Sequence, residues 1–508
     1  MSEPSRPPEA PIALAITVLA AVLAALVSLP CEDFALDDAW IHLAYVKSLQ
    51  LGDGWSYNPG DHEAGCSSPL WVLLLWAWPT AGATVPRVFA LAILLHAATA
   101  WAAAALISAI ARRAATPQQP LPLRSILALG GALVASAPLS LHGVGSGMEV
   151  ALACALALGG LWATIEGRVR TAALLGAAGL LTRPELGAMT MTVAVAAVAL
   201  RARVEPQQRR AAIAAALGAA IAAASWCAWL LATVGQPLPN AFYVKGRGGS
   251  LSGLGYLAEQ VLPWQPWLIG LGGLVLAAAA LRREWQQGRA ALSVVALAAT
   301  SATVVVACTR PLHEGVQFFE ARYFAPLLAP LPVVVAFGLG ALPRWGAAIA
   351  VVPVTLLVGL QGRDTLVRVR DASDDTLVLH TGAARFVADA LPRDAVVAVE
   401  GAGALRWGTP RTMTIVDLVG LNDHHGARLH AHRQAKVCHW IARGPTHAVV
   451  PAHWLPMLGE LFALRPMARF DDAHYTQVEP IGPMAVVVLE LGPPRVPPQA
   501  CPPGPADR

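Results

Sequence analysis

Apolar runs separated by short polar loops make up the first 364 residues of the 508-residue chain. The first run, residues 11–29, can cross a bilayer and is longer than a usual signal-peptide core, so we interpret it as an uncleaved anchor. Ten further runs are candidate spans: residues 87–110, 123–141, 147–165, 171–183, 186–200, 211–234, 262–281, 290–308, 323–341 and 345–361. The pattern predicts a polytopic α-helical membrane protein with about eleven transmembrane helices.

Basic residues fall on alternate loops and set the expected orientation. The loops on one side carry Arg112, Arg113, Arg124, Arg168, Arg170, Arg201, Arg203, Arg209, Arg210, Arg282, Arg283, Arg289 and Arg344. The positive-inside rule makes that side the cytoplasm, so residues 31–85 form a first outer loop. Within it, the apolar run from Pro69 to Trp78 is too short to span and ends at Pro79, which predicts a helix lying at the membrane interface.

The pattern changes after residue 364. Residues 365–492 are hydrophilic enough to fold in water and predict a small α/β domain on the outer face. The expected elements are strands at Val396–Glu400, Met413–Asp417, His447–Val450 and Met484–Leu491, with a helix at Ala383–Leu391. The Pro-rich tail, residues 493–508, is expected to be disordered. Residues 1–364 would form the transmembrane catalytic domain.

Composition supports a membrane protein and excludes a nucleic-acid partner. Hydrophobic residues make up 56% of the chain and charged residues only 13%, and the mean hydropathy is +0.54. The net charge of +4 comes largely from the loop arginines. Cys154, Cys227 and Cys308 lie in spans, whereas Cys31, Cys66, Cys438 and Cys501 would face an oxidising compartment that permits disulfides. No CxxC motif occurs, so no zinc site is assigned.

The first outer loop carries the most distinctive polar residues. Asp37 and Asp38 precede an apolar-periodic segment, so they are candidate helix caps, and one of them is also a candidate general base toward an acceptor hydroxyl. Both interpretations can hold, because a helix start stabilises the anion that a base requires. His62 and Glu63 could bind a sugar or belong to a solvated loop, and two ligands alone leave a divalent metal open without assigning one.

Further polar residues stand at outer ends of the spans and in an outer loop. They are Glu149, Arg183, Glu185, Asn240, Tyr243, Lys245, Glu320 and Arg322. Each alone could be an interfacial anchor. Together, Arg183, Lys245 and Arg322 reach the membrane face expected for Asp37, and cations of this kind suit phosphate recognition. The remaining five are candidates for binding the sugar or acceptor.

This combination predicts a lipid-linked sugar phosphate as the donor. The reaction would be a displacement at the anomeric carbon with polyprenyl phosphate as the leaving group. Cations at the phosphate oxygens can replace a general acid, because the leaving group is already stable as an anion. A single base then suffices.

Two other motifs have several interpretations. The stretch Val397–Arg406 resembles a dinucleotide fingerprint, but Arg406 stands where the third small residue belongs, so we reject a nucleotide site. The cluster of His424, His425, His430 and His432 after Asp423 is consistent with an exposed loop, a metal site or an acceptor-binding role.

The order of the motifs resembles the mycobacterial terminal arabinofuranosyltransferase family. The matching motifs are Asp37–Ala39, Asn58–Gly60, Ser67–Trp71, Gly147–Glu149, Thr182–Glu185, Leu238–Asn240 with Tyr243 and Lys245, Arg322–Tyr323 and Asp417–Asn422. The resemblance implies a membrane glycosyltransferase of the GT-C fold with a polyprenyl-phosphate sugar donor. It also implies inverting transfer to a glycan, glycolipid or protein acceptor on the outer face of the bacterial cytoplasmic membrane. The family's catalytic Asp corresponds to Asp37 or Asp38, and we favour Asp37.

Departures from the family leave the sugar and acceptor open. Ala64–Cys66 stands where relatives tend to have Glu-Gly and Tyr, and Ala241 where Thr is usual. The Trp-rich signature of oligosaccharyltransferases is absent from the sequence, so we do not expect transfer of a whole preassembled glycan. A transporter or flippase is the alternative from another class, and it predicts charges near mid-bilayer or internal repeats, which the sequence does not show. A non-catalytic receptor or scaffold is a third interpretation.

Overall fold

The protein was analysed as a computed structural model, which describes residues 10–79, 84–114, 123–245, 252–265, 272–309, 320–339, 344–477 and 481–495. Contacts divide the chain into two compact units. The helical unit comprises Met1–Pro30, Pro86–Ala224 and Gly249–Arg370, and the sheet unit comprises Cys31–Val85, Ser225–Gly248 and Asp371–Arg508. The first outer loop thus belongs to the sheet unit. The domain boundaries predicted at residues 364 and 492 stay predictions.

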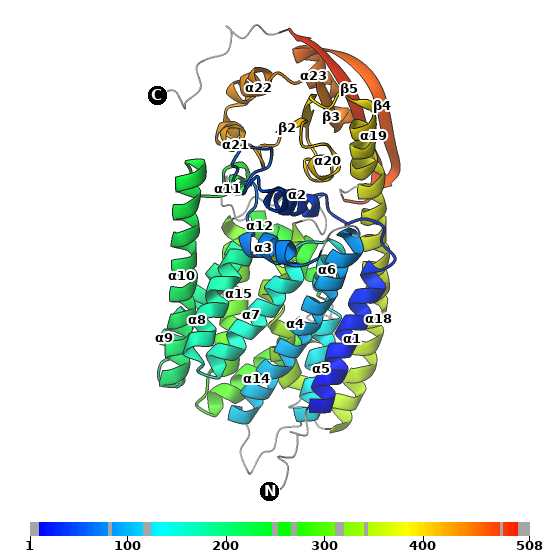
Figure 1. The fold of residues 1–508 in the computed structure, drawn as a ribbon. Coiled ribbons are helices and arrows are strands. Elements are labelled where there is room, and N and C mark those ends of the chain that lie inside the picture. Colours follow the sequence, from blue (N-terminus) through cyan, green and yellow to red (C-terminus); the bar gives the residue numbers. More distant parts are fainter. Residues whose placement is uncertain are drawn as a thin grey trace. The chain divides into compact units, whose positions relative to one another are not determined.

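The helical unit is a bundle of apolar helices (Figure 1). They are α1 Ala10–Ser28, α4 Thr84–Ala114, α5 Leu123–Ala135, α6 Pro138–Gly145, α7 Val150–Ile165, α8 Val169–Thr182, α9 Pro184–Ala199, α10 Pro206–Val234, α12 Ser252–Tyr256, α14 Gly273–Gln286, α15 Ala291–Thr309, α16 Ala325–Leu328, α17 Leu331–Leu339 and α18 Arg344–Asp375. Closely packed pairs are α15 with α9, α14 with α17, α7 with α8 and α1 with α5. The ends of α10 and α18 continue into the sheet unit.

Among the described residues, four helices are long and apolar enough to cross a membrane: α1, α4, α10 and α15. The pair α5 and α6, bent by 44° at its break, raises the number to as many as five. Several others, such as α7, α8 and α9, are apolar but shorter. The expected total of eleven spans therefore stays a prediction.

Three predicted spans are not single helices. The run predicted as 123–141 is divided between α5 and α6. In the run predicted as 262–281, Leu262–Trp264 forms a 3-10 turn and α14 begins only at Gly273, while residues 266–271 lie outside the described part. The run predicted as 323–341 is divided between α16 and α17. Pro330 and Pro332 stand at that division, and proline cannot donate the N–H group that a continuous helix requires.

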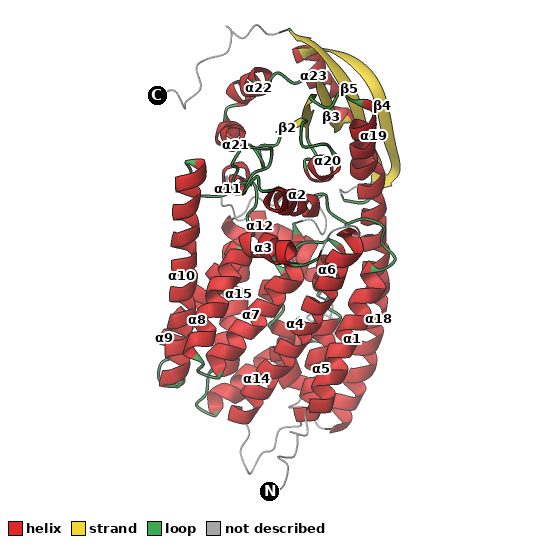
Figure 2. Cartoon of the chain, in the orientation of Figure 1, coloured by secondary structure: helices red, strands yellow, loops and turns green. Residues whose placement is uncertain are grey.

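The sheet unit contains short helices around one five-stranded sheet (Figure 2). Its helices are α2 Asp38–Leu51, α3 Pro69–Ala77, α11 Asn240–Lys245, α19 Gly382–Ala390, α20 Gly403–Gly408, α21 His424–Arg428, α22 Arg433–Ala442 and α23 Leu455–Leu461. Its strands are β1 Val396–Val399, β2 Thr414–Asp417, β3 His447–Pro451, β4 Phe462–Tyr475 and β5 Gly482–Pro494. The strand order is β2-β1-β3-β5-β4, with β1, β2 and β3 parallel and the last two pairings antiparallel.

The four predicted strands and the helix at α19 are all observed, and α3 is the short helix predicted in the first loop. Strand β4 was not predicted. It lies at the edge of the sheet, exposes most of its charged side chains and contains Pro466 beside a register shift, so its sequence lacks the alternation of a half-buried strand. Strand β5 also extends to Pro494, past the predicted start of the tail at residue 493.

The cysteines of the outer segments differ from one another. Cys31 and Cys66 are buried and outside any disulfide, whereas Cys438 is disulfide-bonded. Cys501 lies outside the described residues.

Candidate active site

Asp37 stands immediately before α2, yet its side chain does not cap that helix. Its carboxylate accepts two backbone hydrogen bonds from the start of α20 instead. The Gly403 N–H group donates to Oδ2 at 2.8 Å, and the Ala404 N–H group donates to Oδ1 at 2.7 Å. These N–H groups have no carbonyl partner within a helix start, so an acidic side chain stabilises them. Asp37 therefore caps α20 rather than its own helix.

Asp38 occupies the first turn of α2 and is half-buried. The chain leading to this turn is held by Asp33, which sequence reasoning missed because no motif marks it. Its carboxylate accepts hydrogen bonds from Phe34 N–H at 2.7 Å, Trp40 Nε1 at 2.8 Å and the Thr381 hydroxyl. Burial raises the pKa of Asp33 above its ordinary value. The start of α2 is thus fixed by two aspartates, on either side of Leu36.

Asn58, from the Asn-Pro-Gly turn of the first loop, extends the sheet as a side-chain partner of β2. Its Nδ2 donates to the Ile415 carbonyl at 3.0 Å, and its Oδ1 accepts from the Ile415 N–H at 2.9 Å. The same Oδ1 accepts from Arg406 Nη1 at 3.2 Å. The Asn58–Gly60 motif, which entered the sequence analysis only through the family resemblance, therefore attaches the first loop to the sheet.

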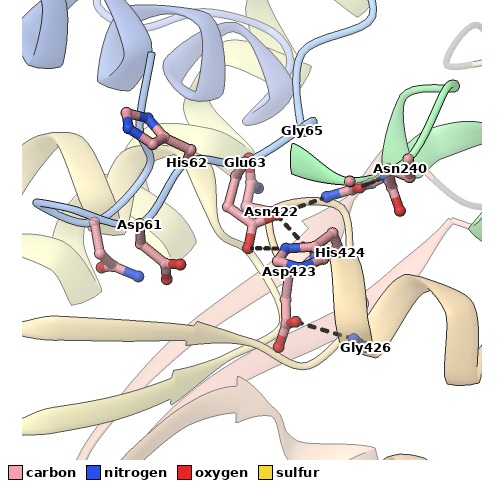
Figure 3. A network of polar contacts seen from close by, with 12 residues as sticks. Asp61, His62, Glu63, Gly65, Asn240, Asn422, Asp423, His424 and Gly426 are labelled. Carbon is pink, nitrogen blue, oxygen red and sulfur yellow. Dashed lines mark hydrogen bonds and ion pairs between the residues drawn. The ribbon is translucent and has the colours of Figure 1, made fainter. Parts of the chain in front are cut away.

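Glu63 is the centre of a buried polar network (Figure 3). Its carboxylate accepts from the His424 N–H at 2.8 Å and from Asn240 Nδ2 at 3.1 Å, and it pairs with His424 Nδ1 at 2.9 Å. The structure thus brings together two of the predicted sugar-binding residues, Glu63 and Asn240. The His62 ring instead lies by the Trp55 carbonyl oxygen, with Nδ1 at 3.3 Å.

Burial raises the pKa of Glu63 to about 7, against the opposing effect of His424. Burial also lowers the pKa of His424, but its hydrogen bond to Glu63 and the negative charge of that carboxylate outweigh burial, so the net shift is upward. Both groups therefore hold protons more tightly in the folded protein than in the unfolded chain.

We expect the stability of the protein to fall as pH rises from about 5 to about 8. The contribution of Glu63 is complete below its ordinary pKa of 4.5 and is lost as pH rises through about 7, and the raised pKa of His424 adds a loss of the same sign. The change should be on the order of 1–3 kcal/mol. Thermal unfolding midpoints of the purified protein across this range measure it. Glu63→Gln removes one titrating group and should flatten the curve, so parallel curves for the two proteins would contradict the assignment.

The histidines after Asp423 are engaged in separate contacts. Asp423 caps α21 by accepting from the Gly426 N–H at 2.9 Å, and it pairs with His439 Nε2 at 2.6 Å. The His425 ring lies against His424, with centroids 4.0 Å apart. No group of three His, Cys, Asp or Glu side chains that could hold a metal ion occurs within the described ranges. Among the four predicted histidines, His424 pairs with a carboxylate, that of Glu63, and the acceptor-binding role of the cluster stays a prediction.

The motif Asp417–Asn422 forms the loop that follows β2. The buried Asp417 carboxylate accepts from three backbone N–H groups, of Val419, Gly420 and Asn422, and from Asn422 Nδ2 at 3.0 Å. Burial raises the pKa of Asp417 to about 6. The Tyr45 hydroxyl in turn donates to Asn422 Oδ1 at 3.4 Å. The Asp417–Asn422 motif, which the sequence marked only through the family resemblance, thus contacts α2 through Tyr45.

In the helical unit, Arg183 and Glu149 form a buried ion pair. Arg183 is extended (φ −150°, ψ 127°) at the break between α8 and α9, because the following Pro184 disfavours helical backbone at this position. Its Nη2 lies 2.8 Å from Glu149 Oε1, and the side chains are 3% and 4% exposed. The Nε and Nη1 groups of Arg183 find no hydrogen-bond acceptor among the described residues. An interfacial anchor would extend its charge to the membrane surface. The Arg183 side chain is instead buried and ion-paired.

Arg322 lies near the same aromatic ring as Arg183. Their guanidinium carbons are each 5.3 Å from the centroid of Tyr323. Glu320 and Arg322 are buried around the 3-10 turn Ala321–Tyr323, and Glu185 is buried in the first turn of α9.

Two predicted residues, Tyr243 and Lys245, lie on α11 in the sheet unit and are half-buried. The binding roles predicted for the residues of both units stay predictions.

Sequence comparisons identify only the C-terminal part of the chain. Residues 370–487 match a family described as a domain of unknown function, DUF8728. A search of the curated proteins finds no match.

Solved structures resemble nearly the whole chain. ArnT from Cupriavidus metallidurans bound to undecaprenyl phosphate is 12% identical, with a TM-score of 0.61 over 94% of this chain and 97% of that one. The archaeal oligosaccharyltransferase AglB from Archaeoglobus fulgidus, in complex with an inhibitory peptide and a dolichol-phosphate, is 10% identical, with a TM-score of 0.53 over 89% and 72%. Both share the GT-C fold. The chain therefore has the GT-C fold, with apolar helices of span length and a small C-terminal sheet domain.

Proposed function

We propose that this protein is a glycosyltransferase that moves a single sugar from a polyprenyl-phosphate donor to a glycan acceptor of the cell envelope. Arabinofuranose is the first candidate sugar, on the strength of the family resemblance. The transfer inverts the anomeric centre and takes place on the outer face of the bacterial cytoplasmic membrane. The C-terminal domain lies on that face in this proposal.

The observation that carries the proposal is the pair Asp37 and Asp38 at the start of α2, held in place on a GT-C fold. The fold covers 94% of the chain in the comparison with ArnT, whose structure contains undecaprenyl phosphate. AglB contains a second lipid phosphate, dolichol-phosphate. A lipid phosphate is therefore the ligand class that both neighbours share.

The chemistry requires one proton transfer. A carboxylate of the pair takes the proton from the acceptor hydroxyl, and the oxygen attacks the anomeric carbon. The bond between that carbon and the phosphate oxygen breaks, and its electrons leave with polyprenyl phosphate. Because the phosphate leaves as a stable anion, positive charge at its oxygens replaces a general acid.

Arg183 is the first candidate for binding the donor phosphate. It is buried, and its Nε and Nη1 groups lack acceptors among the described residues, so two N–H donors are available for a phosphate. Arg322 and Lys245 are further candidates for this role. The residues proposed for sugar or acceptor binding are His62, Glu63, Glu149, Glu185, Asn240, Tyr243 and Glu320. Glu63 and Asn240 are hydrogen-bonded to each other in the network of the first loop.

Reconstituted protein tests the proposal directly. We expect sugar transfer from polyprenyl-phosphate donors to an envelope glycan acceptor, and the double variant Asp37→Asn/Asp38→Asn should lose at least about 100-fold in rate because no base remains. Product glycan is measured with radiolabelled donor. Asp471→Asn, on the exposed edge strand, is the matched control and should transfer at the parent rate.

Two outcomes count against the proposal. Full activity of the double variant would remove the base from the first loop. Movement of the lipid-linked sugar across the bilayer with no glycosidic bond formed would favour the flippase alternative.

A further inference from the structure

We infer that the apolar pocket between α7, α8, α9 and α10 binds the isoprenoid chain of the donor, and that Gly160 keeps space for this chain. The inference rests on the proposed function, because it places the lipid part of the donor beside Arg183, the first candidate for the donor phosphate. The pocket lies wholly within the helical unit (Figure 1). Its described lining residues include none of those proposed for catalysis or for sugar binding.

The lining of the pocket is almost entirely apolar. All four helices contribute to it, with residues such as Leu156, Leu175, Met189 and Ala215. No charged residue occurs among the described lining residues. Thr190, one of the two threonines of the lining, donates its hydroxyl to a carbonyl of its own helix at 2.9 Å. A pocket of this composition offers no hydrogen-bonding specificity and suits a hydrocarbon ligand.

Gly160 is a lining residue that faces open space. A Cβ atom there would meet no heavy atom of the described chain within 4 Å. Gly176 differs, because its Cβ would overlap the Ala215 carbonyl oxygen, so the close packing of α8 and α10 requires a glycine at position 176. Gly160 lies inside α7, where glycine is less favourable than alanine. Packing against the protein gives no reason for glycine at position 160, but room for a ligand does.

Arg183 lies one helical turn from one end of the pocket. Gly179 and Leu186 belong to the lining and flank the break between α8 and α9. The Arg183 N–H donates to the Gly179 carbonyl at 2.8 Å, and the Leu186 N–H donates to the Arg183 carbonyl at 3.0 Å. The backbone of Arg183 is thus bonded directly to two residues of the pocket wall.

The partner of Arg183, Glu149, lies on the face of α7 that lines the pocket. Leu156 and Gly160 follow Glu149 by seven and eleven residues, which are close to two and three helical turns. The three residues therefore lie within about 20° of one another around the helix axis. The Ala153 N–H donates to the Glu149 carbonyl at 2.9 Å, so Glu149 already follows the helix. The buried ion pair and the pocket thus share one face of α7.

The ion pair and the pocket match the two parts of a polyprenyl phosphate. The Arg183 side chain is 3% exposed, and its Nε and Nη1 groups lack acceptors among the described residues, which suits a phosphate. Along α7 the lining runs from Leu156 to Thr164, about 10 to 22 Å beyond Glu149. A chain of about five extended isoprene units covers this distance, because the four C–C bonds of each unit span about 5 Å.

Filling the pocket in the reconstituted full-length protein tests the inference. Gly160→Leu should fold, because the space is empty and leucine favours a helix. We expect its KM for a long-chain polyprenyl-phosphate donor to rise at least about 10-fold, with kcat within about 2-fold, because only binding is lost. For a donor with a single isoprene unit, KM should change by less than about 2-fold, because one unit is too short to reach Gly160, about 16 Å along α7 from Glu149.

A lipid-facing glycine provides the matched control. Gly359 is exposed on α18, and its Cβ would likewise meet no heavy atom of the described chain within 4 Å. Gly359→Leu should therefore match the parent protein with both donors.

Photolabelling gives a readout that needs no sugar transfer. A polyprenyl phosphate with a diazirine in its fourth isoprene unit should label residues 156–164 and 186–193 of the parent protein and of Gly359→Leu. Labelling of these segments should be lost in Gly160→Leu. The parent protein keeps this test available if Gly160→Leu does not fold.

The opposite results are distinct. An unchanged KM of Gly160→Leu for the long-chain donor, or labelling confined to other segments, would overturn the site. Labelling of the pocket by a diazirine phospholipid that polyprenyl phosphate does not displace would make it a site for bilayer lipid and also overturn the inference. Labelling of the pocket by polyprenyl phosphate in a protein that transfers no sugar would support the site and count against the proposed function alone.

Discussion

Replacing Glu149 with Gln is expected to lower the stability of the protein by about 3–5 kcal/mol, because it leaves the buried Arg183 charge without its partner. The side chains are almost fully buried, so water cannot replace the lost carboxylate. Thermal unfolding of the purified protein in detergent, followed by loss of the monodisperse peak, measures the change. If Arg183 binds the donor phosphate as proposed, the same variant should also weaken donor binding, since the orientation of Arg183 is no longer fixed.

A second glutamate of the same unit provides the control. Glu166 pairs with Arg112 at 3.0 Å and Arg113 at 2.8 Å, but these arginine side chains are 57% and 26% exposed. Solvent screens such pairs, so Glu166→Gln should cost less than about 1 kcal/mol. Equal losses for the two variants would show that burial does not determine the strength of the Glu149 pair. Replacing both Glu149 and Arg183 with Leu should recover most of the loss, because no buried charge then remains.

Replacing Asp417 with Ala is expected to destabilise the sheet unit by about 3–5 kcal/mol. The change leaves three backbone N–H groups, two of them buried, and the Asn422 amide without their acceptor. Each unsatisfied donor costs about 1–3 kcal/mol, and relaxation of the loop recovers part of the sum. Because Asn422 contacts Tyr45, the damage should reach α2, and sugar transfer should fall together with stability. Thermal unfolding and hydrogen exchange of residues 38–51 measure the two effects.

An exposed aspartate in the same unit is the control for this substitution. Asp471 lies on β4 and pairs with Arg469 at 2.8 Å, with both side chains more than half exposed. Asp471→Ala should therefore change stability by less than about 1 kcal/mol. Stability losses within 1 kcal/mol of each other for the two variants would contradict the structural role of Asp417.

The success of the strand predictions depended on burial. Val396–Val399 and His447–Pro451 are continuous apolar runs because parallel strands are covered on both faces, and such runs stand out in a polar segment. Strand β4 has the opposite character, since an edge strand needs no continuous apolar face. Its length and place become evident only from its pairing with β5.

Prolines explain where the predicted helix boundaries agree with the structure and where they differ. The break at Arg183–Pro184 could be read from the sequence, because proline restricts the residue before it. The interruption at Pro330 and Pro332 lies within a run apolar enough to pass for a single span. Hydropathy measures how apolar a segment is. It gives no information on whether the backbone of that segment can continue a helix.

The sequence by itself determined the features that depend on local pattern. Apolar runs of span length, loop arginines and the change after residue 364 define a polytopic protein with a C-terminal α/β segment. The polar residues could be singled out because charged groups are costly near a membrane and are rare in this chain. These properties depend on residues that are close together in the sequence, so they can be predicted without knowing which distant residues are in contact.

Only the tertiary structure decided what those polar residues contact. Asp37 meets Gly403 across 366 positions of sequence, Asn58 meets Ile415 across 357, and Glu63 meets His424 across 361. A hydrogen bond depends on distance and direction in space, and the residue type of an aspartate is the same whether it takes a proton or holds a turn. The carboxylates of Asp37 and Asp38 are therefore equivalent in the sequence, and only the structure shows that Asp37 accepts the N–H groups of Gly403 and Ala404.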